Sequence, residues 1–334
     1  GADRVIRPAA VRFQLQTNED HMMQKEINLI QNEVEKVISG KTEVIRKILM
    51  AILAEGHILL DDVPGVGKTT MAVALGKTMN LVYNRVQFTP DVLPSDIVGF
   101  SMYNKETGAF EYKPGIVTET NLLLGDEINR TSSKTQSALL EAMEENQVTV
   151  DGHTYPLKAP FIVIATQNNV GTAGTQLLPY AQMDRFLVRL SIGYPDRAAQ
   201  MALLRQRQNA DPIRNVAQGV TLERVLQMQQ EVRAVTAKDS ILEYITSLAI
   251  ASREHALTEI GISPRGALYL DRMAKACAYL EGRDFVIPED VRAVFADVCA
   301  HRVLLSQQAK TQQSTAQDVM QALLREVALP DAAF

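Results

Sequence analysis

A glycine-rich turn that ends in a lysine and two threonines lies at residues 64–70, with the sequence PGVGKTT. An apolar run at 57–60 precedes it, and residues with helical spacing follow it. Such a loop points backbone N–H groups and the positive end of the helix dipole at a phosphate chain. The lysine then contacts the outer phosphates, and the next hydroxyl coordinates Mg²⁺, so Thr69 is the expected metal ligand. The pattern predicts that a nucleoside triphosphate is bound by Pro64, Gly65, Val66, Gly67, Lys68, Thr69 and Thr70.

The loop departs from the usual phosphate-binding pattern at its first position, where Asp62 replaces a glycine. A chance Gly-Lys-Thr turn is the alternative interpretation, and the strand before the loop and the helix after it argue against that. We expect the phosphate contacts to fall on residues 64–69, so Asp62 should be tolerated without a part in them.

Two acidic residues, Asp126 and Glu127, end the apolar run LLLGDE. Ligands of open α/β sheets bind at the carboxyl ends of the strands, so we expect both acids to lie beside the phosphate loop. Asp126 can hold Mg²⁺ through water, while Glu127 can orient and deprotonate an attacking water, a division of roles typical of hydrolysis. A kinase would need a second substrate pocket, and the guanine-specifying NKxD motif of GTPases is missing. The alternative is that the acids form a solvated strand end.

Asn168 and three arginines are candidates to complete the site. Asn168 follows the apolar run 161–166, so its amide should lie at the same sheet edge and hydrogen-bond the γ-phosphate and the attacking water. Arg185 suits a neighbouring subunit's site, because hydrolytic sites are often completed by such an arginine. Arg265 begins a helix of the second domain and can close over the phosphates in the same subunit, and Arg130 is a third candidate. Each lone arginine is alternatively a surface ion pair.

Short apolar strands that alternate with helices predict an α/β fold with a parallel sheet covered on both faces. The expected strands are 57–60, 81–88, 121–125, 161–166 and 186–192, and the expected helices are 22–38, 42–54, 69–79, 133–144 and 180–184. Thr42 is the expected N-cap of the second helix. Two hairpins interrupt this alternation, at 98–117 and at 147–159, where Asp151-Gly152 is typical of a type I′ turn. We interpret them as projections that engage a substrate, with decorative loop growth as the alternative.

The pattern becomes helical throughout after residue 195. The expected helices are 198–208, 222–235, 241–255, 263–280 and 288–303. The sequence thus predicts a nucleotide-binding α/β domain at 22–194 and a smaller all-helical domain at 195–334. We expect residues 1–21 to be a lead-in that is disordered or foreign to the native chain.

Composition and charge narrow the classes of function. The chain is 46% hydrophobic and 22% charged, which is ordinary for a globular protein, and its net charge of −5 gives no global basic field for nucleic acid or membranes. The cysteines, Cys277 and Cys299, lack metal-type spacing and suit a reducing compartment, and the five histidines are expected to be structural. Without an apolar run of membrane-spanning length or a signal peptide, we expect a soluble cytoplasmic protein with no membrane insertion.

In this order, the motifs resemble those of the AAA+ ATPases, and within that superfamily those of the MoxR family. The resemblance covers about residues 30–305 and rests on the strings VPGVGKTT, RVQFTPDVLPSDIVGF, LLLGDEINRTSSKTQSALLEAMEENQVTV, PFIVIATQN, LLPYAQMDRF, GYPDR and SPRG. It implies that Lys68 and Thr69 belong to Walker A, and that Asp126 and Glu127 belong to Walker B. The implied fold is an AAA+ core with a five-stranded parallel sheet and two inserted hairpins, followed by a helical lid.

The same resemblance assigns roles to the remaining candidates. Asn168 matches sensor 1, Arg265 matches sensor 2, and Arg185 is the arginine finger it favours, with Arg130 left open as the other candidate. The hairpins correspond to the helix-2 insert and to the hairpin before sensor 1. Asn169 departs from the family, which often has proline there.

The resemblance also implies ATP with Mg²⁺, and a homo-oligomeric ring, a hexamer, with its ATP sites between subunits. Such rings act as chaperone-like remodellers of protein partners, frequently proteins with von Willebrand factor A domains. One alternative is a nucleic-acid motor or loader, for which the hairpin tips offer little beyond Lys105 opposite Glu106, and His153. The other is an ATPase subunit of a metal-insertion complex similar to magnesium chelatase.

Overall fold

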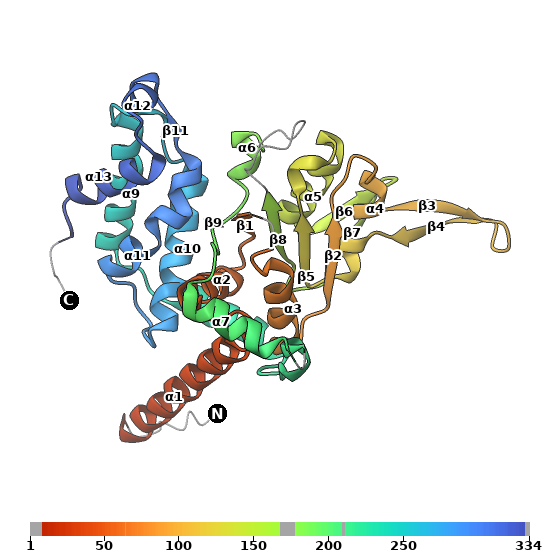
Figure 1. Ribbon diagram of the computed structural model, residues 1–334, viewed down its shortest axis with the longest axis horizontal. Helices are drawn as coiled ribbons and strands as arrows, with labels where there is room; N and C mark the ends of the chain where they lie inside the picture. The colour runs from red at the N-terminus through yellow and green to blue at the C-terminus, as the bar shows by residue number, and fades with distance from the viewer. Residues whose placement is uncertain (1–8, 64, 168–177, 209–210, 331–334) are drawn as a thin grey trace, which may run out of the picture.

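The chain forms a layered α/β part and an all-helical part that lie side by side (Figure 1). The computed structural model describes residues 9–63, 65–167, 178–208 and 211–330, with side chains from residue 22 onward. None of the helices in this described part of the chain combines the length and the apolar character that a membrane span requires.

A five-stranded parallel sheet forms the centre of the α/β part, with the spatial order β2-β5-β8-β1-β9. Its strands are β1 (Ile58–Asp61), β2 (Tyr83–Gln87), β5 (Leu122–Asp126), β8 (Ile162–Gln167) and β9 (Val188–Leu190). The expected fold class, a parallel five-stranded sheet flanked by helices with an additional helical domain, is confirmed. Because β8 lies between β1 and β5, its carboxyl end separates the end of the phosphate-loop strand from the end of the acid-bearing strand.

Helices cover both faces of this sheet, as the apolar strands require. Successive side chains of a strand point to opposite faces. Ile58 and Leu60 of β1 accordingly belong to one hydrophobic core and Leu59 to another. The first core includes residues of α1 (Ala9–Glu35), α2 (Thr42–Leu53) and α3 (Lys68–Thr78), and the second includes residues of α4 (Pro94–Val98) and α5 (Ser133–Glu145).

The short helix α6 (Tyr180–Met183) precedes β9, and the helical part, which is built around α10, follows β9. Its helices are α7 (Arg197–Gln206), α8 (Leu222–Ala234), α9 (Asp239–Glu254), α10 (Pro264–Leu280), α11 (Pro288–Cys299), α12 (Gln307–Thr311) and α13 (Ala316–Glu326). A short antiparallel ribbon pairs β10 (Thr258–Ile260) with β11 (Leu304–Leu305). The ribbon and the last two helices add to the elements expected from the sequence. 3₁₀ turns occur at Ile116–Glu119, Ile128–Arg130, Pro212–Asn215 and Ala300–Arg302.

Both expected hairpins are present, formed by β3 (Gly99–Asn104) with β4 (Ala109–Pro114) and by β6 (Gln147–Val150) with β7 (His153–Pro156). Asp151 and Gly152 have φ angles of 49° and 78°, as a type I′ turn requires. Two expectations about helix starts are wrong. Thr42 is the first residue of α2 and not its N-cap, which is Lys41 without a side-chain capping bond. The first helix begins at Ala9, well before residue 22.

His57 directly precedes β1 and links this strand to α5 and β8 through hydrogen bonds, so it has the structural role expected of it. Its Nε2 lies 3.0 Å from the Met143 carbonyl at the end of α5, and its Nδ1 accepts the Val163 N–H of β8 at 3.0 Å. The two bonds require a neutral ring with its proton on Nε2. Burial lowers the pKa of His57 to about 4.

Acid should therefore destabilise the fold through His57. In the unfolded chain this histidine binds a proton near its ordinary pKa, while the folded chain resists protonation until about pH 4, so stability falls as pH drops through this window. Between pH 7.5 and pH 5 the wild type should lose about 2 kcal/mol more than His57→Gln. Urea unfolding of both proteins at the two pH values measures this, and equal losses would contradict it.

Candidate nucleotide site

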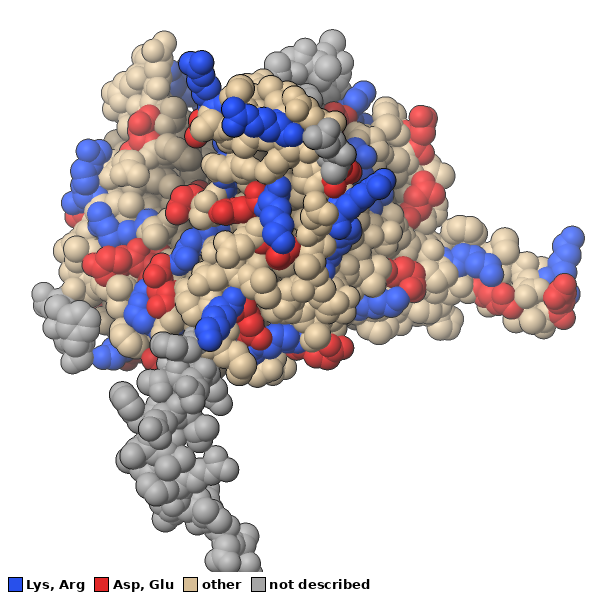
Figure 2. All heavy atoms as spheres, turned by 60° about the horizontal axis from the view of Figure 1, so that its bottom comes forward, with Lys and Arg blue, Asp and Glu red and all other residues tan. Residues whose placement is uncertain are grey.

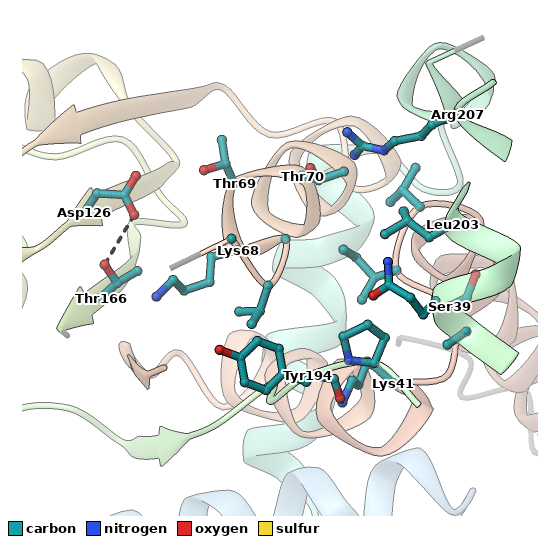
Figure 3. A pocket seen from close by; sticks show the side chains of 18 of the residues that line it. Ser39, Lys41, Lys68, Thr69, Thr70, Asp126, Thr166, Tyr194, Leu203 and Arg207 are labelled. Carbon is teal, nitrogen blue, oxygen red and sulfur yellow. Dashed lines mark hydrogen bonds between the residues drawn. The ribbon is translucent and has the colours of Figure 1, made fainter. Parts of the chain in front are cut away.

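A cavity of about 600 Å³ lies at the carboxyl edge of the sheet, between the start of α3 and the start of the helical part (Figure 3). Its phosphate half is lined by Gly65, Val66, Gly67, Lys68, Thr69, Thr70, Arg85, Gln87, Asp126, Glu127 and Thr166. Its other half is lined by Val37, Ile38, Ser39, Lys41, Tyr194, Pro195, Ala199, Gln200, Leu203 and Arg207. The structure thus brings the expected glycine-rich loop and the acid pair into one cavity, whereas Pro64 and Asn168 lie outside the described residues.

Glycines are required where the loop turns into α3. Gly65 and Gly67 have φ angles of 84° and 96°, in the left-handed region that glycine adopts without strain. A Cβ atom on Gly67 would also lie 2.7 Å from Ile38 Cδ1. Lys68 follows as the first residue of α3, so its backbone N–H is at the helix terminus that attracts anions.

The ammonium group of Lys68 is held against its own loop. Its Nζ donates to the Asp62 carbonyl at 3.2 Å and to the Val63 carbonyl at 3.4 Å. Burial lowers the pKa of Lys68, and the nearby carboxylates of Asp62 and Asp126 oppose that shift. A phosphate chain in this cavity would offer the ammonium group stronger acceptors than these two long bonds.

The acid pair is fixed by β2 and β8. Arg85 of β2 forms an ion pair with Asp126, with 2.7 Å between Nε and Oδ2. Thr166 of β8 donates to Asp126 Oδ1 at 3.3 Å and accepts the Glu127 N–H at 2.9 Å. The second bond stabilises Glu127 in a left-handed backbone conformation with φ 55°, which is unfavourable for a residue with a side chain. Glu127 Oε2 also accepts from Gln87 Nε2 at 3.2 Å.

Arg85, Gln87 and Thr166 are residues of the site that the sequence did not reveal. A usable signal was present for β2, where Arg85 and Gln87 alternate with an apolar residue in a strand of a mostly buried sheet. Their role depends on β2 lying next to β5, where Gln87 is in register with Asp126. The local sequence pattern of β2 does not show which strand lies beside it in the sheet.

The three candidate arginines lie in two places. Arg130 Nη1 lies 2.7 Å from Glu127 Oε2 of the same chain, so it contacts the proposed base. Arg185 and Arg265 both pair with Glu144 near the end of α5, with 3.3 Å between Arg185 Nε and Glu144 Oε2. Among the described residues that line the cavity, none of these arginines is present. The expected closure of Arg265 over the phosphates in the same subunit is therefore not made in this structure, because Glu144 holds it elsewhere.

Asp184 connects the two arginines that share Glu144. It directly precedes Arg185 and accepts from Ser263 Oγ at 3.1 Å, two residues before Arg265. It also forms an ion pair with the fully buried Arg302, with 3.0 Å between Nε and Oδ1. The helical part therefore fixes the segment that carries Arg185, which the sequence did not predict.

A glycine-turned phosphate loop, an acid pair two strands away and a helical lid, all on one parallel sheet, define an ATPase of the AAA type. Residues 57–188 match the family described as "ATPase family associated with various cellular activities (AAA)", and residues 250–323 match the AAA lid domain. Uncharacterized protein YeaC of Bacillus subtilis is 46% identical over 297 residues, covering 89% of this chain and 92% of that protein.

Two further similarities extend over most of the chain. Chaperone MoxR1 of Mycobacterium tuberculosis is 34% identical over 307 residues, covering 89% of this chain and 81% of that protein. A solved structure of a Cytophaga hutchinsonii protein assigned as an ATPase superimposes with a TM-score of 0.87 at 38% identity, covering 96% of this chain and 99% of that chain. The chain belongs to the MoxR family of AAA ATPases, and it binds and hydrolyses ATP.

The bridging hydroxyl of Thr166 gives a prediction for this site. Thr166→Val keeps the shape of the side chain but leaves the Glu127 N–H and Asp126 Oδ1 without this partner. Without the Thr166 hydroxyl as its acceptor, the Glu127 N–H no longer holds Glu127 in the strained backbone conformation. The rate of ATP hydrolysis should therefore fall by about tenfold or more. Steady-state phosphate release measures the rate. Thr166→Ser, which retains the hydroxyl, should keep most of the activity, and equal rates for both variants would contradict the bridge.

Proposed function

We propose that this chain is a subunit of a ring, a hexamer, in which ATP hydrolysis drives the remodelling or activation of a protein partner. The observation that carries this proposal is the separation of the arginines from the cavity. Lys68 and Glu127 line the cavity, whereas Arg185 and Arg265 lie together beside Glu144. A neighbouring subunit that presents its own Arg185 would complete the charge of the site, with Arg130 as the other candidate for this role.

The described residues support different chemical roles for the loop, the acid pair and Thr69 in the cavity. The loop N–H groups and Lys68 would bind the phosphates, and Glu127 would hold the attacking water and accept its proton. Asn168 is our proposal for the amide that contacts the γ-phosphate and this water. The Thr69 hydroxyl and the Asp126 carboxylate line one cavity and are the oxygen ligands that Mg²⁺ prefers, so they would hold that ion, which would neutralise charge on the phosphates.

The surface favours a protein over a nucleic acid as the partner. The hairpin of β3 and β4 projects from the body and carries exposed Phe100, Met102, Tyr103 and Phe110. Figure 2 shows acidic and basic side chains interspersed over one face and at the end of this projection, which gives no continuous basic track. A relative named Chaperone MoxR1 supports a chaperone-like role. Within that role we propose a protein with a von Willebrand factor A domain as the partner.

Domain limits and location belong to the same proposal. We place the nucleotide-binding domain at residues 22–194 and the helical lid at 195–334, because the chain changes from α/β to helical between β9 and α7. Residues 1–21 form the lead-in, of which 9–21 belong to α1. We propose the cytoplasm as the location, where the buried free thiols of Cys277 and Cys299 would stay reduced.

Glu127→Gln should separate binding from turnover. The amide keeps the size and some hydrogen bonds of the side chain but cannot accept a proton, so phosphate release should fall at least about 100-fold while ATP affinity is unchanged. Equilibrium binding of ATP and phosphate release measure the two effects, and substantial hydrolysis by this variant would exclude Glu127 as the base.

The ATP-loaded Glu127→Gln variant should also retain the protein partner, which affinity capture and mass spectrometry would identify. Recovery of nucleic acid instead would contradict the proposal.

Mixed rings test donation of Arg185 between subunits. Arg185→Ala and Lys68→Ala subunits should each be inactive alone, because each ring lacks one part of every site. In mixed rings, an intact loop can meet an intact arginine of the neighbour, so part of the ATPase activity should return. The control is Arg130→Ala mixed with Lys68→Ala. Recovery in the control alone would assign the role to Arg130, and no recovery in rings shown to be mixed would contradict donation by either arginine.

A further inference from the structure

Asp62 is a buried carboxylate at the start of the phosphate loop, with 8% of its surface exposed. Its oxygens accept three hydrogen bonds from the segment after β9: from Ser191 Oγ at 2.8 Å, from the Ile192 N–H at 2.5 Å and from the Gly193 N–H at 2.9 Å. A buried anion is tolerated only when donors bind it, as these groups do. The carboxylate is therefore directed at the linker between β9 and α7.

This linker leads directly into the wall of the cavity. Tyr194 and Pro195 follow the bound segment and line the half of the cavity away from the phosphate loop, together with Leu203 of α7. Lys41 Nζ donates to the Tyr194 carbonyl at 2.8 Å, so the wall has a second attachment to the turn before α2. Figure 3 shows Leu203 on the opposite side of the loop residues from Asp126. The wall is therefore placed to meet the nucleoside of a nucleotide whose phosphates lie at the loop.

We propose that Asp62 is a positioning residue that sets the distance between the phosphate loop and this wall. The backbone of Asp62 belongs to the loop, where its carbonyl accepts from Lys68, while its side chain holds the linker. One residue thus joins two halves of the cavity that are distant in sequence. A wall that is already ordered before binding increases the affinity for the ligand, because the entropy lost on ordering the wall then does not reduce the free energy of binding. The proposal rests on ATP as the ligand and identifies what couples its nucleoside and phosphate contacts.

The two halves should respond to a change at this position in opposite directions. Asp62→Gly restores the glycine usual in phosphate loops but leaves the Ile192 and Gly193 N–H groups without their acceptor, so the wall should loosen. The same change removes a negative charge near Lys68, which favours a bare phosphate chain. ATP should bind at least about tenfold more weakly, whereas inorganic tripolyphosphate should bind equally or more tightly.

Titration calorimetry of the full chain with magnesium ATP and with inorganic tripolyphosphate tests this difference. Asp61→Asn is the matched control, because Asp61 is the adjacent carboxylate and pairs with Arg189 of β9. Among the described lining residues of the cavity, neither Asp61 nor Asp62 is present. The control should leave both affinities within about twofold of the wild type. Asp62→Asn keeps one acceptor oxygen and should weaken ATP binding by about threefold, again without weakening tripolyphosphate. This variant carries the comparison should Asp62→Gly not fold.

The possible results separate this proposal from the ATP assignment. Wild-type affinity of Asp62→Gly for ATP would overturn the positioning role, and so would an equal loss of ATP and tripolyphosphate affinity, which would make Asp62 a part of the phosphate site. An equal effect of Asp61→Asn would also overturn it. A wild-type chain that binds tripolyphosphate but not ATP would contradict ATP as the ligand and the wall with it.

Discussion

The compensation of charge at the carboxyl edge of the sheet is the constraint on which the rest of the structure depends. Parallel strands end at one edge, so acidic side chains accumulate beside the phosphate loop. Each of these acids is bound by a group from another element: Asp61 by Arg189, Asp62 by the linker after β9, Asp126 by Arg85, and Glu127 by Gln87. The sheet order supplies these partners, since β9 adjoins β1 and β2 adjoins β5.

The same requirement explains how the lid is attached. Arg302 is fully buried, and a buried guanidinium is tolerated only with partners that satisfy it. Asp184 is one such partner, and backbone carbonyls before β9 supply others, so the lid binds the segment that contains Arg185. Ser263 links Asp184 to the start of α10. Any movement of α10 would therefore be transmitted to both Arg185 and Arg265, and in the proposed ring this connection would link hydrolysis to the neighbouring subunit.

The sequence predicted the elements well because their signals are local, whereas the partners of the site depend on neighbour relations. Apolar runs located every strand of the sheet, and the glycine spacing located the loop around Lys68. The pairing of Arg85 with Asp126 could not be predicted, since it requires β2 to lie next to β5. The pairing of Arg265 with Glu144 could not be predicted for a similar reason, because Glu144 lies far from it in sequence. Asp62 was read as a tolerated irregularity, although its side chain bonds the linker.

Charge balance also bears on why, in the proposed ring, a single subunit would be an incomplete enzyme. Around the phosphate half, the acids Asp61, Asp62, Asp126 and Glu127 are matched in number by the bases Lys68, Arg85, Arg130 and Arg189. A triphosphate that enters this balanced environment brings several negative charges, which are unfavourable in a partly desolvated cavity. The positive charge that compensates the phosphates must come with the nucleotide, as Mg²⁺, or from a second copy of the chain. Glu144 pairs with Arg185 at a place outside its own cavity, so in the proposed ring the charge of Arg185 is available to the neighbour's nucleotide. The site would then gain its missing positive charge in the same step in which the subunits assemble.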